Sequence, residues 1–189
     1  MKIISLLATL LLCCSGLTLA QEAQQAPTFT PLNMPEGQTR GQIKGNIEAG
    51  KIIPMRWAES SSVALVPATR FEQFNGKQVF YAIALPANSY IKLKMVPEKN
   101  KKINLYALRE SSQGDLQIPP NVTSVISSEA SYPIYANLGN GRQVRNRDKG
   151  YREVEYISTN RSYSIVIGVA GAEGEVEGDF TLDIEIGSR

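Results

Sequence analysis

The chain has 189 residues, with 20 lysines and arginines against 18 aspartates and glutamates, two cysteines and no histidine. A formal net charge of +2 argues against binding nucleic acid by bulk electrostatics, which needs a strongly basic face. The lack of histidine excludes Ser-His-Asp and Cys-His catalytic centres and zinc sites built on imidazoles.

Residues 1–20 have the organisation of a secretory signal peptide. Lys2 gives a positive start, the run from Ile3 to Cys14 is almost entirely apolar, and Ala20 ends a short segment with small residues. The apolar run is shorter than the roughly 20 residues that a membrane-spanning helix needs. We expect cleavage after Ala20 and a periplasmic or secreted protein without a transmembrane span.

Both cysteines, Cys13 and Cys14, lie within this leader. A lipid anchor on one of them is the alternative to a free protein, because acyl chains would tether the domain to a membrane. Leu12 precedes Cys13, whereas a bacterial lipobox normally has a small residue before its cysteine. From Gln21 on the chain can form no disulfide, so a hydrophobic core must hold the fold.

The remaining sequence divides into a lead-in and one domain. Residues 21–40 contain three prolines and few large apolar side chains, which predicts a flexible lead-in. From Gly41 on, apolar residues recur with a period of two, which is typical of strands and not of helices. We expect a single β-domain over residues 41–189.

The clearest strand signals lie between Gln78 and Val96. Two alternating segments flank the turn 86–89, and they predict a β-hairpin whose second strand is half exposed. The outward Lys92 and Lys94 of that second strand are interpreted as protection of a sheet edge. An Asn-Gly turn signal just upstream predicts that residues 70–74 pair back onto the hairpin.

Two further strands are equally clear. Residues 162–169 are apolar on both faces, which predicts a central strand, and residues 180–186 alternate strictly, which predicts a strand with one polar face. Weaker strands are expected at 41–47, 52–58, 103–108 and 152–157. Together these elements predict an all-β fold, a jelly-roll-like antiparallel β-sandwich.

One long irregular loop interrupts this pattern. Residues 109–149 are polar and alternate poorly, and a structureless insertion of that length in a compact domain is unusual. Short strands within it are expected at 123–126 and 133–136.

Six short motifs follow one another along the domain: Gly41-Gln42-Ile43, Ala84-Leu85-Pro86-Ala87, Tyr90 to Met95, Asn104-Leu105-Tyr106, Tyr163 to Ile167, and Gly178 to Leu182. In this order they resemble the bacterial pre-peptidase C-terminal (PPC) domain family over residues 41–187. The resemblance implies a jelly-roll-like sandwich of a kind usually appended to secreted peptidases. Some members bind substrate or calcium. No peptidase sequence precedes the motifs here, so the appended role is not expected of this chain.

A glycine-rich turn near the C-terminus carries carboxylates at every second position: Glu173, Glu175, Glu177 and Asp179. Carboxylates that converge on a turn can bind Ca²⁺, which takes about six to eight oxygen ligands. The alternative is a solvated turn, which we favour because the segment lacks the density of Asp and Asn found in calcium loops. No other cofactor is expected.

A basic segment is the main candidate for a binding surface, and its residues are Arg142, Arg145, Arg147, Lys149, Tyr151 and Arg152. Arginine with interleaved aromatic residues suits anionic polymers such as acidic glycans. The alternative is a solvated basic loop, partly offset by nearby acidic residues. Trp57 is a second candidate, as a sugar-stacking platform if its ring faces solvent and as a core residue if it does not.

These observations predict an exported, non-catalytic β-sandwich module that binds a protein or polysaccharide partner in the cell envelope or outside the cell. One alternative is an envelope stability or assembly factor without a discrete ligand. Another is a hydrolase that uses only carboxylates, as glycosidases do with a pair, although the sequence shows no such pair. The identity of the partner and the oligomeric state are left open at this point.

Overall fold

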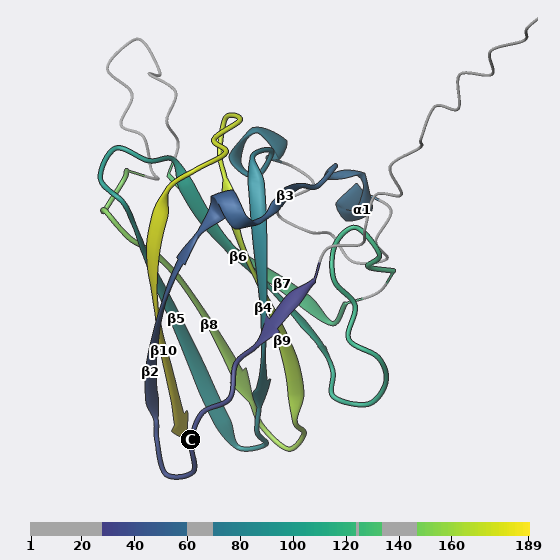
Figure 1. Cartoon of the computed structure of the whole chain (residues 1–189). Helices are drawn as coiled ribbons and strands as arrows, with labels where there is room; N and C mark the ends of the chain where they lie inside the picture. Colours follow the sequence, from purple (N-terminus) through teal and green to yellow (C-terminus); the bar gives the residue numbers. More distant parts are fainter. Residues whose placement is uncertain (1–27, 60–69, 124, 134–146) are drawn as a thin grey trace, which may run out of the picture.

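A computed structural model describes residues 28–59, 70–123, 125–133 and 147–189, and they form a sandwich of two β-sheets (Figure 1). The predicted jelly-roll-like, mostly antiparallel β-sandwich is therefore confirmed. The expected leader lies outside the described residues. In the ranges just given, no helix has the length and apolar character needed to cross a membrane.

Sheet A has the strand order β1-β4-β9-β6-β7, and the short strand β3 also pairs with β4. Its strands are β1 (Phe29–Pro31), β3 (Lys51–Ile52), β4 (Lys77–Leu85), β6 (Ile103–Ser111), β7 (Ser127–Ser131) and β9 (Tyr163–Gly171). Strand β9 runs antiparallel between β4 and β6 and is buried on both faces along most of its length. The central strand predicted at 162–169 is thus confirmed.

Sheet B has the order β2-β10-β5-β8, and each of its strand pairs is antiparallel. Its strands are β2 (Arg40–Asn46), β5 (Ser89–Pro97), β8 (Arg152–Ser158) and β10 (Asp179–Ser188). On β5, Ile91, Leu93 and Met95 are fully buried, while Lys92 and Lys94 are exposed. Sheet B therefore has the one apolar and one polar face that alternation predicts.

The predicted hairpin between residues 78 and 96 is wrong in its pairing, because β4 and β5 belong to different sheets. The chain crosses from sheet A to sheet B at the turn between them, where the Ser89 hydroxyl donates to the Pro86 carbonyl at 2.5 Å. Strand β5 pairs on both sides, so Lys92 and Lys94 do not lie at an edge and edge protection does not explain them.

Three weaker expectations also differ from the structure. Strand β3 ends at Ile52 and helix α1 (Arg56–Glu59) follows, because Pro54 cannot donate to a strand ladder. Residues 70–74 form the 3-10 helix η3 (Phe71–Gln73) and do not pair as a strand. The expected flexible lead-in is partly built into the fold, since β1 pairs in parallel with β4.

The long segment between β6 and β8 contains one described strand, β7, which lies between the two short strands expected there. Residues 134–146 and 124 lie outside the described part. Strands at 41–47, 103–108 and 152–157 are confirmed as β2, β6 and β8.

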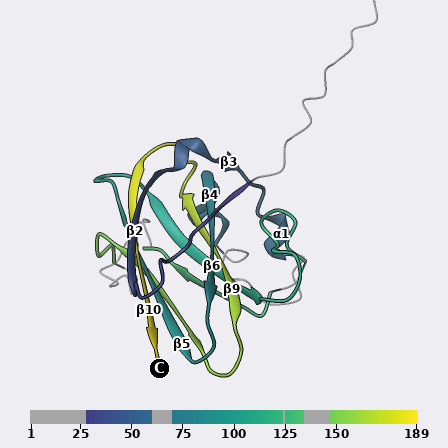
Figure 2. The same cartoon turned by 60° about the horizontal axis from the view of Figure 1, so that its bottom comes forward.

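Two apolar cores result from this arrangement. The main core lies between the sheets and includes Leu85, Leu93, Leu105, Ile167 and Leu182. A second core covers the outer face of sheet A, where Phe80, Tyr106, Leu108 and Val166 pack against Ile53, Met55, Trp57, Phe74, Val122 and Val125. In Figures 1 and 2, α1 lies beside sheet A on the side away from β2 and β10.

Candidate functional site

Arg152 begins β8 with its side chain turned into the protein, and it is 1% exposed. Its Nη1 and Nη2 bind the two carboxylate oxygens of Asp148 at 2.9 and 3.2 Å, and its Nε donates to Asn104 Oδ1 at 3.0 Å. This forked contact is a strong, geometrically specific form of ion pair. The expectation that Arg152 contacts a ligand at the surface is therefore corrected, because its donors are directed inward.

Buried polar groups continue behind Arg152. The Asn104 amide donates to the Gln73 carbonyl at 2.9 Å and to Gln73 Oε1 at 3.1 Å. Nearby, the Tyr106 hydroxyl donates to Gln78 Oε1 at 2.8 Å. Burial raises the pKa of Tyr106, so this hydroxyl stays protonated. The bonds from Asn104 attach η3 to β6, and the bond from Tyr106 links the side chains of β6 and β4. Buried polar groups are normally satisfied in this way.

The described part of the basic segment, residues 147–151, forms a tight turn that Asp148 organises; we name it the basic loop. Besides Arg152, Asp148 accepts a hydrogen bond from the Gly150 backbone N–H at 2.7 Å, and Gly150 has a φ of +76°. Desolvation raises the pKa of Asp148, but the hydrogen bonds from Arg152 and Gly150 outweigh it and hold this pKa below its usual value. Arg147 and Lys149 are exposed on the resulting turn.

Tyr151 connects the basic loop to the outer face of sheet B. The Lys94 ammonium lies 4.6 Å from the centre of the Tyr151 ring, which is within the range of a cation–π contact. Lys94 is thus a member of this site that the sequence interpretation missed. Its outward position on β5 was visible in the alternation, but its contact with a residue on another strand was not.

The other binding candidates are not all brought together. Arg142 and Arg145 lie outside the described residues. Trp57 is 3% exposed and its ring lies 6.1 Å from that of Tyr106, inside the second core. Of the two alternatives for Trp57, the core residue is therefore confirmed and the stacking platform is wrong, because the ring is covered by protein.

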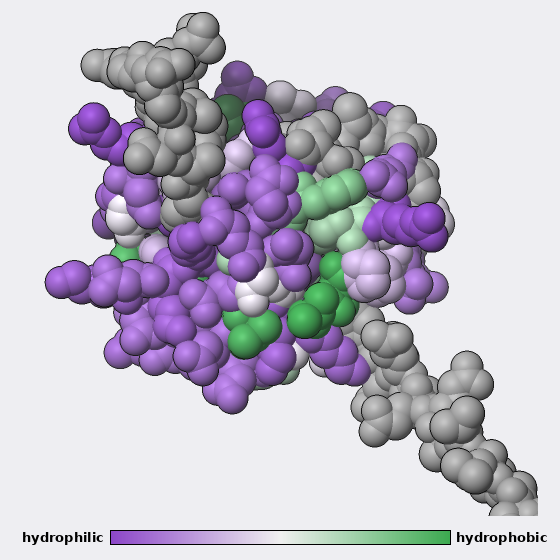
Figure 3. Space-filling model, turned by 90° about the horizontal axis from the view of Figure 1, so that it is seen from above, coloured by the Kyte–Doolittle hydropathy of each residue, from purple (hydrophilic) through white to green (hydrophobic). Residues whose placement is uncertain are grey.

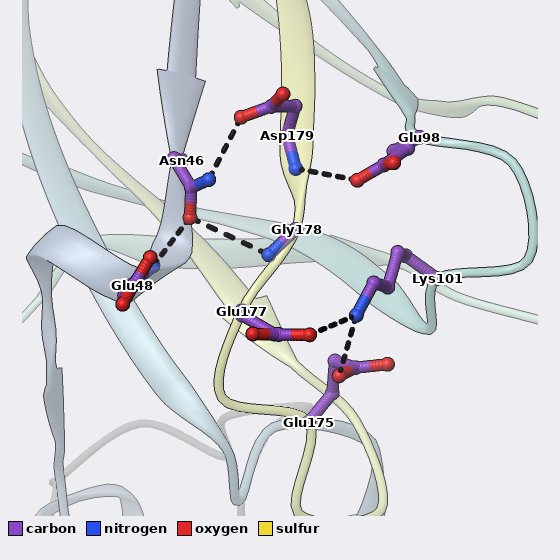
Figure 4. A network of polar contacts seen from close by, with 8 residues as sticks. All are labelled: Asn46, Glu48, Glu98, Lys101, Glu175, Glu177, Gly178 and Asp179. Atoms are coloured by element: carbon purple, nitrogen blue, oxygen red, sulfur yellow. Dashed lines mark hydrogen bonds and ion pairs between the residues drawn. The ribbon is translucent and has the colours of Figure 1, made fainter.

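The four carboxylates considered for calcium do not converge. Figure 4 shows how Glu175, Glu177 and Asp179 lie. Glu175 and Glu177 both bind Lys101 Nζ, at 3.4 and 2.9 Å, and Glu173 pairs with Lys102. Asp179 instead accepts a hydrogen bond from the Asn46 amide at 2.8 Å.

The carboxylates of Glu173, Glu175 and Glu177 thus bind lysine ammonium groups, which take the role that a metal ion would have. The hydrogen bond to Glu177 raises the pKa of Lys101, and the same bond lowers the pKa of Glu177. Within the described ranges, no group of three or more acidic side chains could hold a metal ion, so the structure gives no support to the calcium alternative at this turn. Figure 3 looks onto this end of the sandwich, where hydrophilic residues cover most of the surface.

Glu110 is a buried carboxyl group on the outer face of sheet A, with a residue exposure of 6%. Its Oε2 accepts a hydrogen bond from the Gln117 backbone N–H at 2.9 Å, and Oε1 has no hydrogen-bond partner among the described residues. Burial raises its pKa, against the opposing effect of the Gln117 bond. Glu110 therefore supports the loop before β7.

The outer face of sheet B is lined by charged and polar side chains in register. One row contains Arg40, Glu185, Lys92 and Glu155, and the next contains Gln42, Asp183, Lys94 and Glu153. Arg40 pairs with Glu185 at 3.2 Å, and Lys92 pairs with Glu155 at 3.8 Å. All of these residues except Glu155 line a shallow depression of about 590 Å³. This face is therefore polar, open and balanced in charge.

No known protein family and no curated protein matches the chain. Among solved structures, it is similar to PliG of Aeromonas hydrophila, a periplasmic inhibitor of g-type lysozyme, with 12% identity, a TM-score of 0.44, and coverage of 85% of this chain and 96% of that one. The PPC domain of a Bacillus anthracis collagenase has 10% identity, a TM-score of 0.40, and coverage of 85% and 98%. CorA, a surface-associated copper-binding protein of Methylomicrobium album BG8, has 7% identity, a TM-score of 0.45, and coverage of 87% and 99%. The second of these three belongs to the family that the motifs resemble, and we carry no functional residue over from any of them.

Proposed function

We propose that this chain is an exported, non-catalytic module that binds a protein or polysaccharide partner through the basic loop and the adjoining edge of the sheet B face. One observation carries the proposal. Asp148 and Arg152 fix the loop to the sandwich, so that Arg147 and Lys149 project into solvent from a defined turn. A preformed group of side chains loses less conformational entropy on binding than a mobile one.

The chemistry of this surface suits anionic groups. Arg147 and Lys149 are exposed cations, and the Lys94–Tyr151 pair beside them adds a third cation and an aromatic ring. Carboxylate, sulfate or phosphate groups on an acidic glycan or an acidic protein surface would complement these side chains. Arg142 and Arg145 precede this loop in the sequence and belong to the same basic segment.

The absence of catalytic activity is proposed from the residues available. Without histidine or, beyond Gln21, cysteine, a base or nucleophile would have to be a carboxylate, a lysine or a tyrosine. Burial raises the pKa of Tyr81, and the hydrogen bond to Glu177 raises that of Lys101. Both shifts are opposite to those that activate a nucleophile.

The test is retention of the purified protein on cell-envelope fractions. We expect a variant with Arg142, Arg145, Arg147 and Lys149 all changed to alanine to lose retention. The matched control changes four basic residues elsewhere, Arg56, Arg70, Lys99 and Arg161, all of them exposed. It removes the same charge and should be retained like the unmodified protein.

Equal retention of the loop variant and the control would contradict the proposal. Treating the fractions with protease before the assay separates the two classes of partner. Loss of retention after this treatment indicates a protein, and persistence indicates a polysaccharide.

A further inference from the structure

The charge pattern on the outer face of sheet B is complementary to itself. The strands lie in the order β2, β10, β5 and β8, and the row through Arg40, Glu185, Lys92 and Glu155 alternates positive, negative, positive and negative. The same row taken from β8 to β2 has every sign reversed. A surface with this property can oppose its own copy without bringing like charges together.

A two-fold axis parallel to the strands, running between β10 and β5, produces this opposition. It places β2 against β8 of the second copy and β10 against β5 of the second copy. Arg40 then faces Glu155 of the second copy, and Lys92 faces Glu185 of the second copy. Such a contact is isologous, because each residue pair occurs twice.

The neighbouring rows fit the same axis. In the second row, Asp183 faces Lys94 of the second copy, and Gln42 faces Glu153 of the second copy. In the next row Val96, which is 40% exposed, faces Thr181 of the second copy, so an apolar side chain meets a methyl-bearing one. No like charges meet in any of the three rows.

We propose that this face is a self-association surface and that its occupant is a second copy of this chain. Within the three rows the charges balance, with Arg40, Lys44, Lys92 and Lys94 against Glu153, Glu155, Asp183 and Glu185; Asp179, at the start of β10, lies beyond these rows. Two copies are therefore not driven apart by net charge. The outer face of sheet A is covered by the second core, which leaves sheet B as the open sheet face of the described fold.

Because the contacts across this interface join exposed charged side chains, they determine how tightly the two copies associate and how the association responds to salt. A single exposed ion pair contributes little stability, but here each central charge already has an opposite neighbour in its row and gains another across the interface. Charge complementarity mainly selects the partner and its register. Twisted sheets pack at about 30°, so the rows through Lys92 and Lys94, near the middle of β5, should keep opposite charges closest together. We expect reversible, salt-sensitive dimers.

The test uses charge reversal and the full chain, expressed with its own leader and purified as the cell processes it. Lys92→Glu places carboxylates opposite carboxylates in a homodimer, and Glu185→Lys places ammonium groups opposite ammonium groups. Sedimentation equilibrium should show that each variant alone has a dissociation constant at least about tenfold higher than the unmodified chain. An equimolar mixture of the two should dimerise again, because every contact then joins opposite charges.

Recovery on mixing separates an interface from a folding defect, because the same two chains are present in both measurements. The pair Lys94→Glu and Asp183→Lys repeats the test in the second row. Arg161→Glu is the control, with an equal charge change at an exposed position in the turn between β8 and β9. It should leave the dissociation constant unchanged.

Salt gives an independent measurement. At 1 M NaCl the screening length falls to about 3 Å, so the unmodified chain should sediment as a monomer. The inference is overturned if the chain is monomeric at every concentration in low salt, if mixing restores no dimer, or if Arg161→Glu weakens the dimer as much as Lys92→Glu. It does not rest on the proposed function, because Lys92 and Glu185 belong neither to the basic loop nor to the Lys94–Tyr151 pair beside it; of the four reversals, only Lys94→Glu changes the proposed binding surface.

Discussion

The two sheets of this sandwich present their outer faces in opposite ways. On sheet A, Tyr106 and Leu108 are fully buried under the segments that carry Phe74 and Val122. On sheet B, the outward side chains, such as Lys92 and Glu155, remain open to solvent. Sheet A thus contributes to stability through both of its faces, whereas sheet B leaves one face open to solvent, and it is on this face that we propose contacts with other molecules.

The largest expected difference between the faces concerns stability. Phe74 is fully buried and its ring meets those of Tyr106 and Tyr132 edge-on, at 5.5 and 5.7 Å. Phe74→Ala should lower the free energy of unfolding by about 3–5 kcal/mol. Val96→Ala on the open face of sheet B should change it by about 0.5 kcal/mol or less. Urea denaturation of both variants measures this. If both lost the same free energy of unfolding, the two outer faces would not differ in their contribution to stability.

A smaller loss is expected where the basic loop joins the sandwich. Arg152→Ala leaves Asn104 Oδ1 without this donor and releases Asp148. We expect a loss of about 2 kcal/mol in the free energy of unfolding, since buried groups that lose a charged partner are costly. Arg147→Ala, at an exposed position on the same loop, is the matched control and should be close to neutral. A neutral Arg152→Ala would contradict the anchoring role.

The covered outer face of sheet A should also make the stability of the protein depend on pH, because it encloses the carboxyl group of Glu110. Burial raises its pKa in the folded protein, so folding favours the protonated form. Its contribution is therefore most favourable below the ordinary carboxyl pKa of about 4.3 and is lost as the pH rises through the raised value.

Glu110→Gln should accordingly be more stable than the unmodified protein at neutral pH, and this advantage should disappear in acid. Thermal unfolding followed across the pH range measures both. An advantage that is the same at every pH would show that ionisation of Glu110 is not its cause.

The smallest effects are expected at the exposed acidic turn. Lys101→Ala should leave the free energy of unfolding almost unchanged, because ion pairs at the surface contribute little. Calcium should leave the unfolding temperature of the unmodified protein unchanged, since Lys101 and Lys102 pair with the carboxylates. A rise in that temperature with calcium concentration would reveal binding to the native state and would restore the calcium site.

Whether a strand is buried on one face or on both could be predicted, because burial determines the pattern of apolar residues along that strand. Strand β9 is apolar on both faces and β10 alternates, and each has the environment that its pattern indicates. Which strand pairs with which is not visible in such a local pattern. A turn like the one before Ser89 occurs equally well between paired strands and between strands of opposite sheets, which is why the hairpin prediction was wrong.

The candidate site was predictable only in part for the same reason. Arg152 belongs to a basic run, but it is also in phase with Val154 and Tyr156, and this alternation indicated an inward side chain. The contact of Lys94 with Tyr151 and that of Lys101 with Glu177 join residues far apart in the chain. Spacing in the sequence contains no sign of either contact.

The most direct test measures unfolding and envelope retention side by side on two variants. Arg147→Ala combined with Lys149→Ala changes the open side of the molecule, and Ile53→Val removes a methylene from the second core, where Ile53 is 4% exposed. We expect the loop variant to lose retention and to keep its free energy of unfolding, and we expect Ile53→Val to lose about 1 kcal/mol of that free energy and to be retained in full. Full retention of the loop variant, with lost retention of the folded Ile53→Val protein, would contradict it.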